Sequence, residues 1–250
     1  MEKSKISKRK LKKRRKILKF LLFVMIIISI YLFAFKTDYF NITDIKVVGN
    51  KKMSYEQIVK ASTCIKGENI FKINVTHSEE SLKMLPYIKN CKVKRKLPNE
   101  IIIEIEERKD IAIISYLGSF AYIDEKGYIL SIEGKKGKVS LPQIFGLKEI
   151  NIRVGNNIFD TLEMSNIKEF IVYSDQLNIL SSIKYINLSN YKNIMLELND
   201  GIKVAFGPLD NVKYKLRFLY RILEDINKND MHVKQILFNK GNSPIIVQDN

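Results

Sequence analysis

The chain has 250 residues, of which 28% are charged and 46% hydrophobic, an ordinary globular composition that excludes wholesale disorder. Its formal net charge is +16, but residues 1–19 supply +10 of that charge, with eleven Lys and Arg against Glu2 alone. Because the basic character is concentrated in a terminal tail, the net charge does not indicate a nucleic-acid-binding domain.

An uncharged apolar run, Phe20 to Phe35, directly follows the basic tail. As a helix extended back to Ile17, it would span about 28 Å, close to the roughly 30 Å hydrocarbon core of a bilayer. The run has no polar face, and its one small residue near the end, Ala34, lies between two phenylalanines, unlike a signal-peptide cleavage site. We therefore predict an uncleaved transmembrane anchor at residues 20–36, with the lipid bilayer as its partner.

The charges on the two sides of this run predict its orientation. The tail of +10 favours the cytoplasmic side, whereas Lys36 and Asp38 cancel on the other side. The sequence therefore predicts a single-pass membrane protein with a cytoplasmic N-terminus and about 210 extracytoplasmic residues. The tail would lie beside anionic lipid, so no nucleic-acid partner is expected.

Residues 39–108 predict a small α+β domain with the element order β-α-α-β-β. A short alternating strand comes first. Two helices follow, and each begins with a capping box: Ser54 with Gln57, and Thr76 with Glu79. Residues 69–75, between the two helices, are predicted to be extended. The second helix is expected to end before Pro86.

The segment Cys91 to Ala112 contains the hairpin that closes this domain, and the two strands of the hairpin carry opposite charges. Pairing Val93 with Ile105 keeps the apolar positions of both strands on one face. The same register places two lysines opposite two glutamates, each pair stabilising by roughly a few tenths of a kcal/mol: Lys94 with Glu104 and Lys92 with Glu106. The loop would be Pro98 to Glu100. Arg95 falls on the apolar face, and the pattern offers no reason for it.

Residues 109–250 predict a mixed β-sheet domain with two helices packed on it. The expected helices cover 159–180 and 209–227, and the second has a regular apolar stripe. The expected strands and turns are, in chain order, a hairpin turning at 124–127, an extended stretch at 141–146, a strand at 183–189, two strands joined by a type I′ turn at Asp200-Gly201, and closing strands at 233–238 and 243–248.

Catalytic and metal-binding motifs are missing from the sequence. The two histidines, His77 and His232, lie in different blocks, and neither has a metal-ligand spacing to Cys, Asp or Glu. Glu104 and Glu106 lie on one strand face with a spacing similar to that of the two carboxylates of a glycosidase. They are expected instead to pair with the facing lysines. We therefore predict no enzyme, with no catalytic residue, no metal and no cofactor. The alternative is a membrane-anchored extracytoplasmic cell-wall enzyme.

Two cysteines, Cys64 and Cys91, fall in the part expected outside the cytoplasm. An oxidising exterior would permit a disulfide between them. The alternative is that both are small buried apolar side chains. Their spacing does not decide between the two, because a disulfide depends on geometry.

Several motifs, taken in order, resemble the FtsQ/DivIB family of bitopic bacterial cell-division proteins. Besides the basic tail and the apolar run, they are IKVVGN (45–50), SYEQI (54–58), KGENIFKIN (66–74), LPYIKNCKVKRKLPNEIIIEIEER (85–108), AYIDEKGYIL (121–130), LPQIFG (141–146) and LNDGIKVAFG (198–207). The resemblance implies four parts: a cytoplasmic tail at 1–19, the anchor at 20–36, a POTRA domain at 39–108 and the family's β domain at 109–250.

The resemblance also implies a non-enzymatic scaffold of the divisome at the division septum. The family docks the small bitopic proteins FtsL and DivIC (or FtsB), and through them helps to regulate septal peptidoglycan synthesis. Its POTRA domain is linked to other membrane proteins of the divisome. Carried over by position, the implied partner-binding residues are Ile236, Leu237, Phe238, Ser243, Pro244, Ile245, Ile246, Val247 and Gln248.

The last predicted strand, 243–248, supports a docking role on physical grounds. A terminal strand can leave an edge whose N–H and C=O groups accept a strand from another chain. We therefore hypothesise that a DivIC-like partner adds a strand at this edge.

Overall fold

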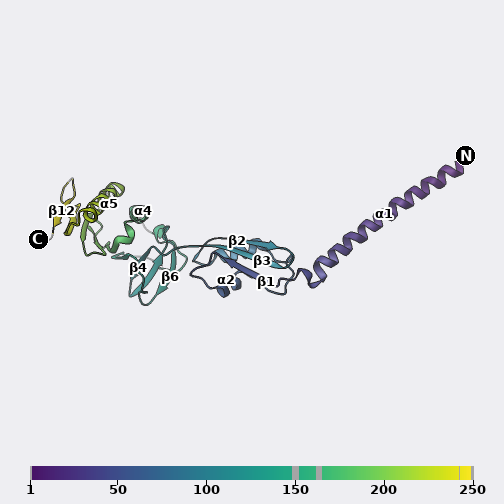
Figure 1. Ribbon diagram of the computed structural model, residues 1–250, viewed down its shortest axis with the longest axis horizontal. Helices are drawn as coiled ribbons and strands as arrows, with labels where there is room; N and C mark the ends of the chain where they lie inside the picture. The colour runs from purple at the N-terminus through teal and green to yellow at the C-terminus, as the bar shows by residue number, and fades with distance from the viewer. Residues whose placement is uncertain (1, 148–151, 162–164, 242, 249–250) are drawn as a thin grey trace. The chain divides into compact units, whose positions relative to one another are not determined.

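The computed structural model describes four ranges of the chain: 2–147, 152–161, 165–241 and 243–248 (Figure 1). Contacts divide the chain into two compact units: Met1–Lys83 with Asn90–Glu106, and Met84–Lys89 with Glu107–Asn250. The first unit holds a long N-terminal helix and a three-stranded sheet, and the second holds a nine-stranded sheet with two α-helices. The predicted α+β class is confirmed.

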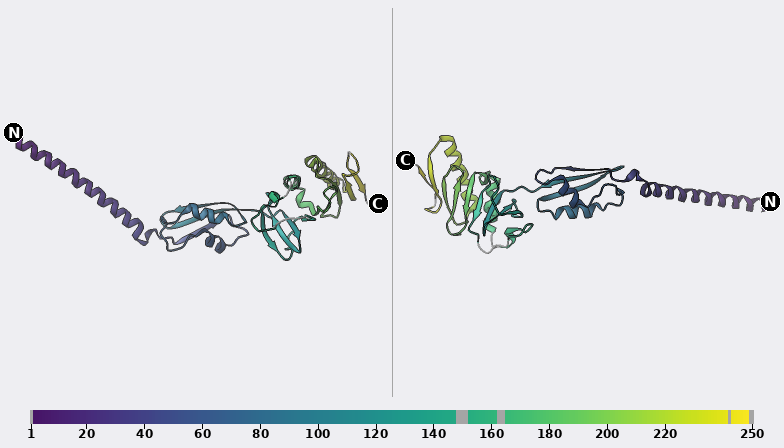
Figure 2. Two further views of the ribbon diagram at one scale, coloured as in Figure 1. Left: turned by 180° about the vertical axis from the view of Figure 1, so that it is seen from behind. Right: turned by 90° about the horizontal axis from the view of Figure 1, so that it is seen from below.

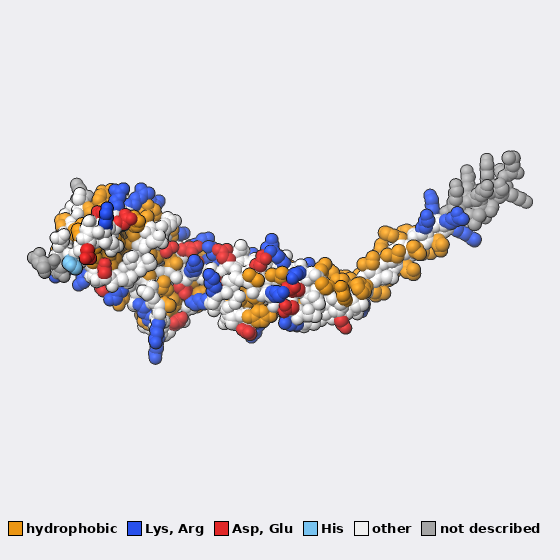
Figure 3. Space-filling model, in the orientation of Figure 1, with side chains coloured by type: hydrophobic (Ala, Val, Ile, Leu, Met, Phe, Trp, Pro, Cys, Tyr) orange, Lys and Arg blue, Asp and Glu red, His pale blue; other side chains and the backbone are white. Residues whose placement is uncertain are grey.

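Helix α1 (Glu2–Lys36) contains the apolar run. The segment Lys13–Lys36 of this helix has 24 residues and is long and apolar enough to cross a membrane. Its most apolar stretch is not buried against the rest of the chain. At 1.5 Å per residue the segment spans about 36 Å. Hydrophobic side chains cover the C-terminal part of this helix, and Lys and Arg side chains precede them (Figure 3). The helix therefore fits a single-pass membrane protein.

The three-stranded sheet follows the predicted β-α-α-β-β order. Its elements are β1 (Asp44–Val48), α2 (Tyr55–Ser62), α3 (Val75–Lys83), β2 (Ile88–Lys96) and β3 (Glu100–Glu107). The strand order is β1-β3-β2, with β1 parallel to β3. Alternate residues of β3 are buried because successive side chains point to opposite faces. The core of this unit includes Ile45, Ile58, Ile70, Leu82, Ile101 and Ile103.

The first predicted capping box is confirmed, and the second is wrong. Ser54 Oγ accepts from the Gln57 N–H at 3.2 Å, and Gln57 Oε1 accepts from the Ser54 N–H at 3.0 Å. Helix α3 instead begins after Asn74, whose Oδ1 accepts a backbone N–H from its first turn at 3.1 Å. Because asparagine is a strong N-cap, it starts the helix two residues early. Thr76 lies inside the helix, and Glu79 hydrogen-bonds to β2.

The predicted extended piece at 69–75 is also wrong, because residues 70–72 form a turn and helix α3 already begins at Val75. Asn69 Oδ1 accepts from the Phe71 N–H at 3.0 Å, and the Asn69 carbonyl accepts from the Lys72 N–H at 3.0 Å. An asparagine that hydrogen-bonds to the backbone two residues further on favours a turn over a strand.

This turn explains Arg95, the residue for which the hairpin pattern offers no reason. Arg95 Nε donates to the Ile70 carbonyl at 2.9 Å, and Nη2 donates to the Ile73 carbonyl. A guanidinium presents several donors in a fixed fork, so one side chain satisfies two carbonyls of an irregular segment.

One of the two ion pairs predicted for the charged hairpin is confirmed. Lys94 Nζ lies 2.5 Å from Glu104 Oε1 across β2 and β3. The second predicted pair stays a prediction. The loop covers Leu97–Asn99, one residue earlier than predicted, because Glu100 already belongs to β3.

Glu100 joins all three strands through its carboxylate, which lies 2.7 Å from Lys46 Nζ and 2.9 Å from Lys96 Nζ. The ammonium groups of Lys46 and then Lys96, held this close to the carboxylate, lower the pKa of Glu100 from its ordinary value. Since the folded pKa lies below the unfolded one, the ion pairs stabilise the fold above the unfolded pKa. That stability is lost as the pH falls through the folded pKa.

We therefore expect acidification from about pH 6 to about pH 3 to destabilise the wild-type chain more than a Glu100→Gln variant. Urea unfolding at a series of pH values measures the two slopes. Glu104→Gln serves as the comparison, because the exposed ion pair of Glu104 joins only two strands whereas those of Glu100 join three. Identical slopes for wild type and Glu100→Gln would contradict the prediction.

The second unit is built on one mixed sheet with the order β12-β11-β10-β9-β8-β7-β4-β5-β6. Its strands are β4 (Ala112–Tyr116), β5 (Ser119–Ile123), β6 (Ile129–Glu133), β7 (Gln143–Phe145), β8 (Ile183–Asn187), β9 (Ile194–Leu198), β10 (Lys203–Gly207), β11 (Val233–Leu237) and β12 (Ile245–Gln248). Three pairs are parallel, namely β4–β7, β7–β8 and β10–β11. Short 3₁₀ turns lie at Ile158–Thr161 and Leu180–Ser182.

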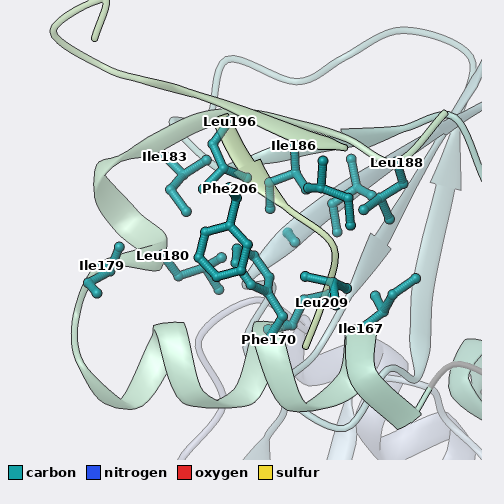
Figure 4. Packing of buried hydrophobic residues seen from close by; sticks show 14 of the residues in the cluster. Ile167, Phe170, Ile179, Leu180, Ile183, Ile186, Leu188, Leu196, Phe206 and Leu209 are labelled. Carbon is teal, nitrogen blue, oxygen red and sulfur yellow. The ribbon is translucent and has the colours of Figure 1, made fainter. Parts of the chain in front are cut away.

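Helices α4 (Ser165–Gln176) and α5 (Val212–Asn229) complete the unit. The Phe170 ring of α4 meets the Phe206 ring of β10 edge to face, with centroids 5.2 Å apart (Figure 4). Four positions of the predicted stripe on α5 are buried, and Leu223 is only partly buried. The buried residues of α5 are Val212, Leu216, Leu219, Ile222 and Ile226.

Two local predictions for this unit need correction. The helix predicted at 159–180 is shorter, with a 3₁₀ turn before it, and its residues 162–164 lie outside the described residues. The turn after β9 is not type I′. Gly201 has φ 92°, but Asp200 is not among the positive-φ residues, as type I′ requires. The Gly201 N–H instead bonds to the Leu198 carbonyl at 3.1 Å, so Asn199 also belongs to the loop.

Candidate docking edge of the nine-stranded sheet

Strand β12 forms one edge of the nine-stranded sheet. It pairs antiparallel with β11, and no strand of the described residues lies beyond it. The views in Figure 2 show these C-terminal strands, in yellow, at one end of their unit. An edge strand presents backbone N–H and C=O groups that its own sheet leaves unpaired. This edge therefore has main-chain donors and acceptors for another chain.

The neighbours of β12 explain how the edge is positioned. Helix α5 carries the chain from β10 to the parallel strand β11, and the chain then turns back into β12. Ile236 lies opposite Val204 on one side and Ile246 on the other. The Phe238 ring, just after β11, lies 5.8 Å from the Phe206 ring. These contacts tie the edge to the buried core.

The side chains of β12 leave an apolar surface on both faces of the sheet edge. Ile245 is 45% exposed and Ile246 is 39% exposed. Adjacent strand residues point to opposite faces, so a chain laid along this edge would find an apolar contact on either side. Strand β12 itself carries no charge.

The predicted binding residues differ in how exposed their side chains are. Ile236 is fully buried in the core, so its side chain supports the edge from behind. Leu237 and Phe238 are partly buried. The side chains with open surface belong to the final segment: Ser243, Ile245, Ile246 and Gln248, with Pro244 and Val247 partly buried.

A depression of about 360 Å³ lies beside this edge, and the sequence reasoning missed most of its wall. Lys215 is fixed there by an ion pair with Asp210 and by donating to the Pro208 carbonyl at 2.8 Å. Tyr214 of α5 is 56% exposed although it is aromatic, and its ring lies 4.9 Å from that of Phe218. That exposed aromatic residue is the sequence signal that could have found the depression. Its wall includes Pro208, Tyr214, Lys215, Phe238, Asn239 and Pro244.

Outside this edge, the cysteines and histidines are the side chains that the sequence analysis considered for catalysis or metal binding. Among the described residues, no group of three or more His, Cys, Asp or Glu could hold a metal ion. Cys64 and Cys91 are both free and buried. Burial raises the pKa of the Cys91 thiol, which opposes the thiolate form that a nucleophile needs. His77 lies in α3 and His232 just before β11, in different units.

The chain matches known cell-division proteins over most of its length. Residues 40–108 match the POTRA domain, FtsQ-type, and residues 112–236 match the Cell division protein FtsQ/DivIB, C-terminal. The chain is 31% identical to the cell division protein DivIB of Clostridium tetani over 204 residues, which cover 80% of this chain and 77% of the relative. It is 30% identical to DivIB of Bacillus cytotoxicus over 196 residues, covering 76% and 71%. Against FtsQ of Corynebacterium glutamicum the identity is 23% over 171 residues, covering 68% and 73%.

A solved structure of the major extracytoplasmic domain of DivIB from Geobacillus stearothermophilus, as its trans isomer, aligns with a TM-score of 0.31 at 15% identity. It covers 50% of this chain and 98% of that domain.

One membrane-length apolar helix, a POTRA domain and a mixed sheet domain define the class: a POTRA-bearing, single-pass bacterial cell-division protein. The chain belongs to the FtsQ/DivIB family. The proteins of this family act with other division proteins in the divisome.

Proposed function

We propose that this protein is a non-enzymatic bitopic scaffold of the divisome. It docks FtsL-like and DivIC- or FtsB-like partners at the septum, and through them helps to regulate septal peptidoglycan synthesis. Family membership supports the divisome role. The observation that carries the docking role is the uncharged edge strand β12, with Ile245 and Ile246 exposed.

The proposed organisation of the chain has four parts. Residues 1–19 are a cytoplasmic tail, 20–36 cross the membrane, 39–108 form the POTRA domain and 109–250 form the β domain. The N-terminus lies in the cytoplasm, because the dense positive charge of the tail favours that side. The two C-terminal domains lie outside the cytoplasm, where they meet the partners' external segments.

Docking proceeds by strand addition at β12. A partner strand takes up the outward N–H and C=O groups of Ser243 to Gln248, while its side chains cover Ile245 on one face and Ile246 on the other. Phe238 lines the depression beside the edge, Leu237 is partly buried next to it in the chain, and Ile236 holds the edge against the core. Main-chain hydrogen bonds supply affinity, and the flanking apolar contacts supply specificity.

Substitutions at two edges of the same sheet test this proposal. Ile246→Asp is expected to weaken binding to a purified DivIC-like partner by about tenfold or more, because a carboxylate would have to be desolvated in an apolar contact. Ile132→Asp is the matched control, since Ile132 lies on the opposite edge strand β6 and is 37% exposed, close to the 39% of Ile246. It is expected to bind like wild type.

A double proline variant, Ile245→Pro with Val247→Pro, removes main-chain donors from β12 and is expected to abolish co-purification with the partner. Undiminished binding by this variant would refute docking at β12. A lytic band from the purified full chain on a peptidoglycan zymogram would instead support the cell-wall enzyme.

A further inference from the structure

A cluster of aromatic rings surrounds the point where helix α1 ends. It is called here the aromatic collar, and its members are Tyr31, Phe33, Phe35, Tyr39, Phe40 and Phe71. Five of the rings come from α1 and the short 3₁₀ turn Asp38–Phe40 that follows it. The sixth, Phe71, comes from the 70–72 turn of the POTRA domain. Its centroid lies 5.0 Å from that of Phe40 and 5.8 Å from that of Phe35.

Hydrogen bonds fix the POTRA turn to the end of the helix. The side chain of Asn69 is buried, and its Nδ2 donates to the Ala34 carbonyl at 2.7 Å. Carbonyls in the last turn of a helix have no partner within the helix, so this bond supplies one from the POTRA domain. The Ile70 N–H also donates to the Phe40 carbonyl at 2.9 Å. Phe71 is thereby held at the level where α1 ends.

The collar is not closed over by protein. Phe33 is 51% exposed and Tyr39 is 58% exposed, although both rings meet the Phe40 ring edge to face. The collar is also continuous with the membrane-length helix, which ends at Lys36. Large amphipathic rings concentrate where hydrocarbon meets headgroups. Lys36 and Lys72 are exposed beside the rings, as is the single carboxylate of Asp38. The two ammonium groups favour anionic and zwitterionic headgroups.

We propose that the aromatic collar is a lipid-contacting surface, and that the POTRA turn carrying Phe71 seats in the headgroup region of the leaflet where α1 ends. The membrane contact of this protein then extends beyond the spanning helix into a loop of the POTRA domain. Asn69 of that loop lies 35 residues after Ala34, whose carbonyl it binds. The ligand is the interfacial zone of the bilayer itself, recognised by aromatic rings flanked by lysines. This inference rests on α1 crossing the membrane, and not on the proposed docking at β12.

The absence of tryptophan from the sequence permits a direct test. A Phe71→Trp variant of the full chain, reconstituted into phosphatidylcholine vesicles, carries one tryptophan as the reporter. Lipids brominated near the headgroup end of their acyl chains quench fluorophores at that depth. We expect quenching at Phe71→Trp to be at least about twofold stronger than at Tyr191→Trp, an exposed position in the other unit.

A second reporter keeps the test decisive if Phe71→Trp does not fold. Lys72→Trp lies on the same turn and is exposed, so it disturbs no packing. It is expected to be quenched like Phe71→Trp. Adding Asn69→Ala to Lys72→Trp removes the tie to α1 and is expected to reduce the quenching. Quenching of both turn reporters no stronger than that of Tyr191→Trp would overturn the proposal.

Discussion

Replacing Asp124 by alanine is expected to lower the free energy of unfolding of the second unit by about 3–5 kcal/mol. The Asp124 side chain is 2% exposed and lies in the turn between β5 and β6. One oxygen lies 2.6 Å from Arg108 Nη1, and the other accepts from the backbone N–H groups of Lys126 and Tyr128 at 2.9 and 2.8 Å. Three donors therefore converge on one buried carboxylate.

The size of this effect comes from what the substitution leaves behind. The Arg108 side chain is only 17% exposed, and its guanidinium lies 4.2 Å from the centre of the Tyr128 ring. Without Asp124 this charge stays mostly buried and unpaired, and two backbone donors lose their acceptor. Breaking a buried pair by removing one partner costs far more than the pair itself contributes.

Two variants serve as controls for Asp124. Asp124→Asn keeps an acceptor but removes the charge, so its loss should be smaller. Glu125→Ala removes only an exposed ion pair with Lys89, whose atoms lie 3.3 Å apart, and is expected to cost under about 1 kcal/mol. Urea unfolding followed by circular dichroism measures the loss, and hydrogen exchange over residues 112–133 locates it. A loss from Asp124→Ala as small as that from Glu125→Ala would contradict the prediction.

Replacing Phe206 by alanine is expected to cost about 3–5 kcal/mol as well, through a cavity in the core rather than an unpaired charge. Phe206 is fully buried on β10, where its ring meets the Phe170 ring of α4 (Figure 4). The Phe238 ring after β11 is its second aromatic neighbour, with centroids 5.8 Å apart. Alanine would leave both rings without their shared neighbour. Phe206→Leu keeps most of the volume and is expected to cost less than half as much.

This substitution also links the core to the docking edge. Phe238 lines the depression beside β12, so a loosened Phe238 should weaken partner binding even in molecules that remain folded. Thermal unfolding measures the stability, and partner titration at low temperature measures the binding. If Phe206→Ala and Phe206→Leu lose equal stability, the cavity explanation is wrong.

Features encoded by short spacings could be predicted from the sequence. The Ser54 capping box, the Lys94–Glu104 pair and the apolar stripe of α5 each depend on residues within about ten positions of one another. The hydrophobic period and the chemistry of the caps act over that range. The wrong second capping box shows the limit of such patterns, because Asn74 competed for the same helix start and is the stronger cap.

Features that depend on distant contacts could not be predicted. Arg95 is explained only by carbonyls 22 and 25 residues away. The order of the nine strands depends on parallel pairs such as β7–β8, which join segments about 40 residues apart. A local pattern identifies a strand but not its neighbours. For the same reason the sequence predicted the strand at 243–248, but not the residues of α5 that form the depression beside it.

The parallel pairing of β10 with β11 has a consequence for when the docking edge exists. Strand β12 can pair only after β11 is in place, and β11 reaches β10 only after α5 has crossed between them. Contacts that close long loops form slowly, and peripheral strands open at a lower free energy than central ones. The edge should therefore be the last part of this unit to fold and the first to fray. A partner strand that binds the ordered edge would hold it closed by mass action, so complex formation and completion of the sheet become one coupled equilibrium.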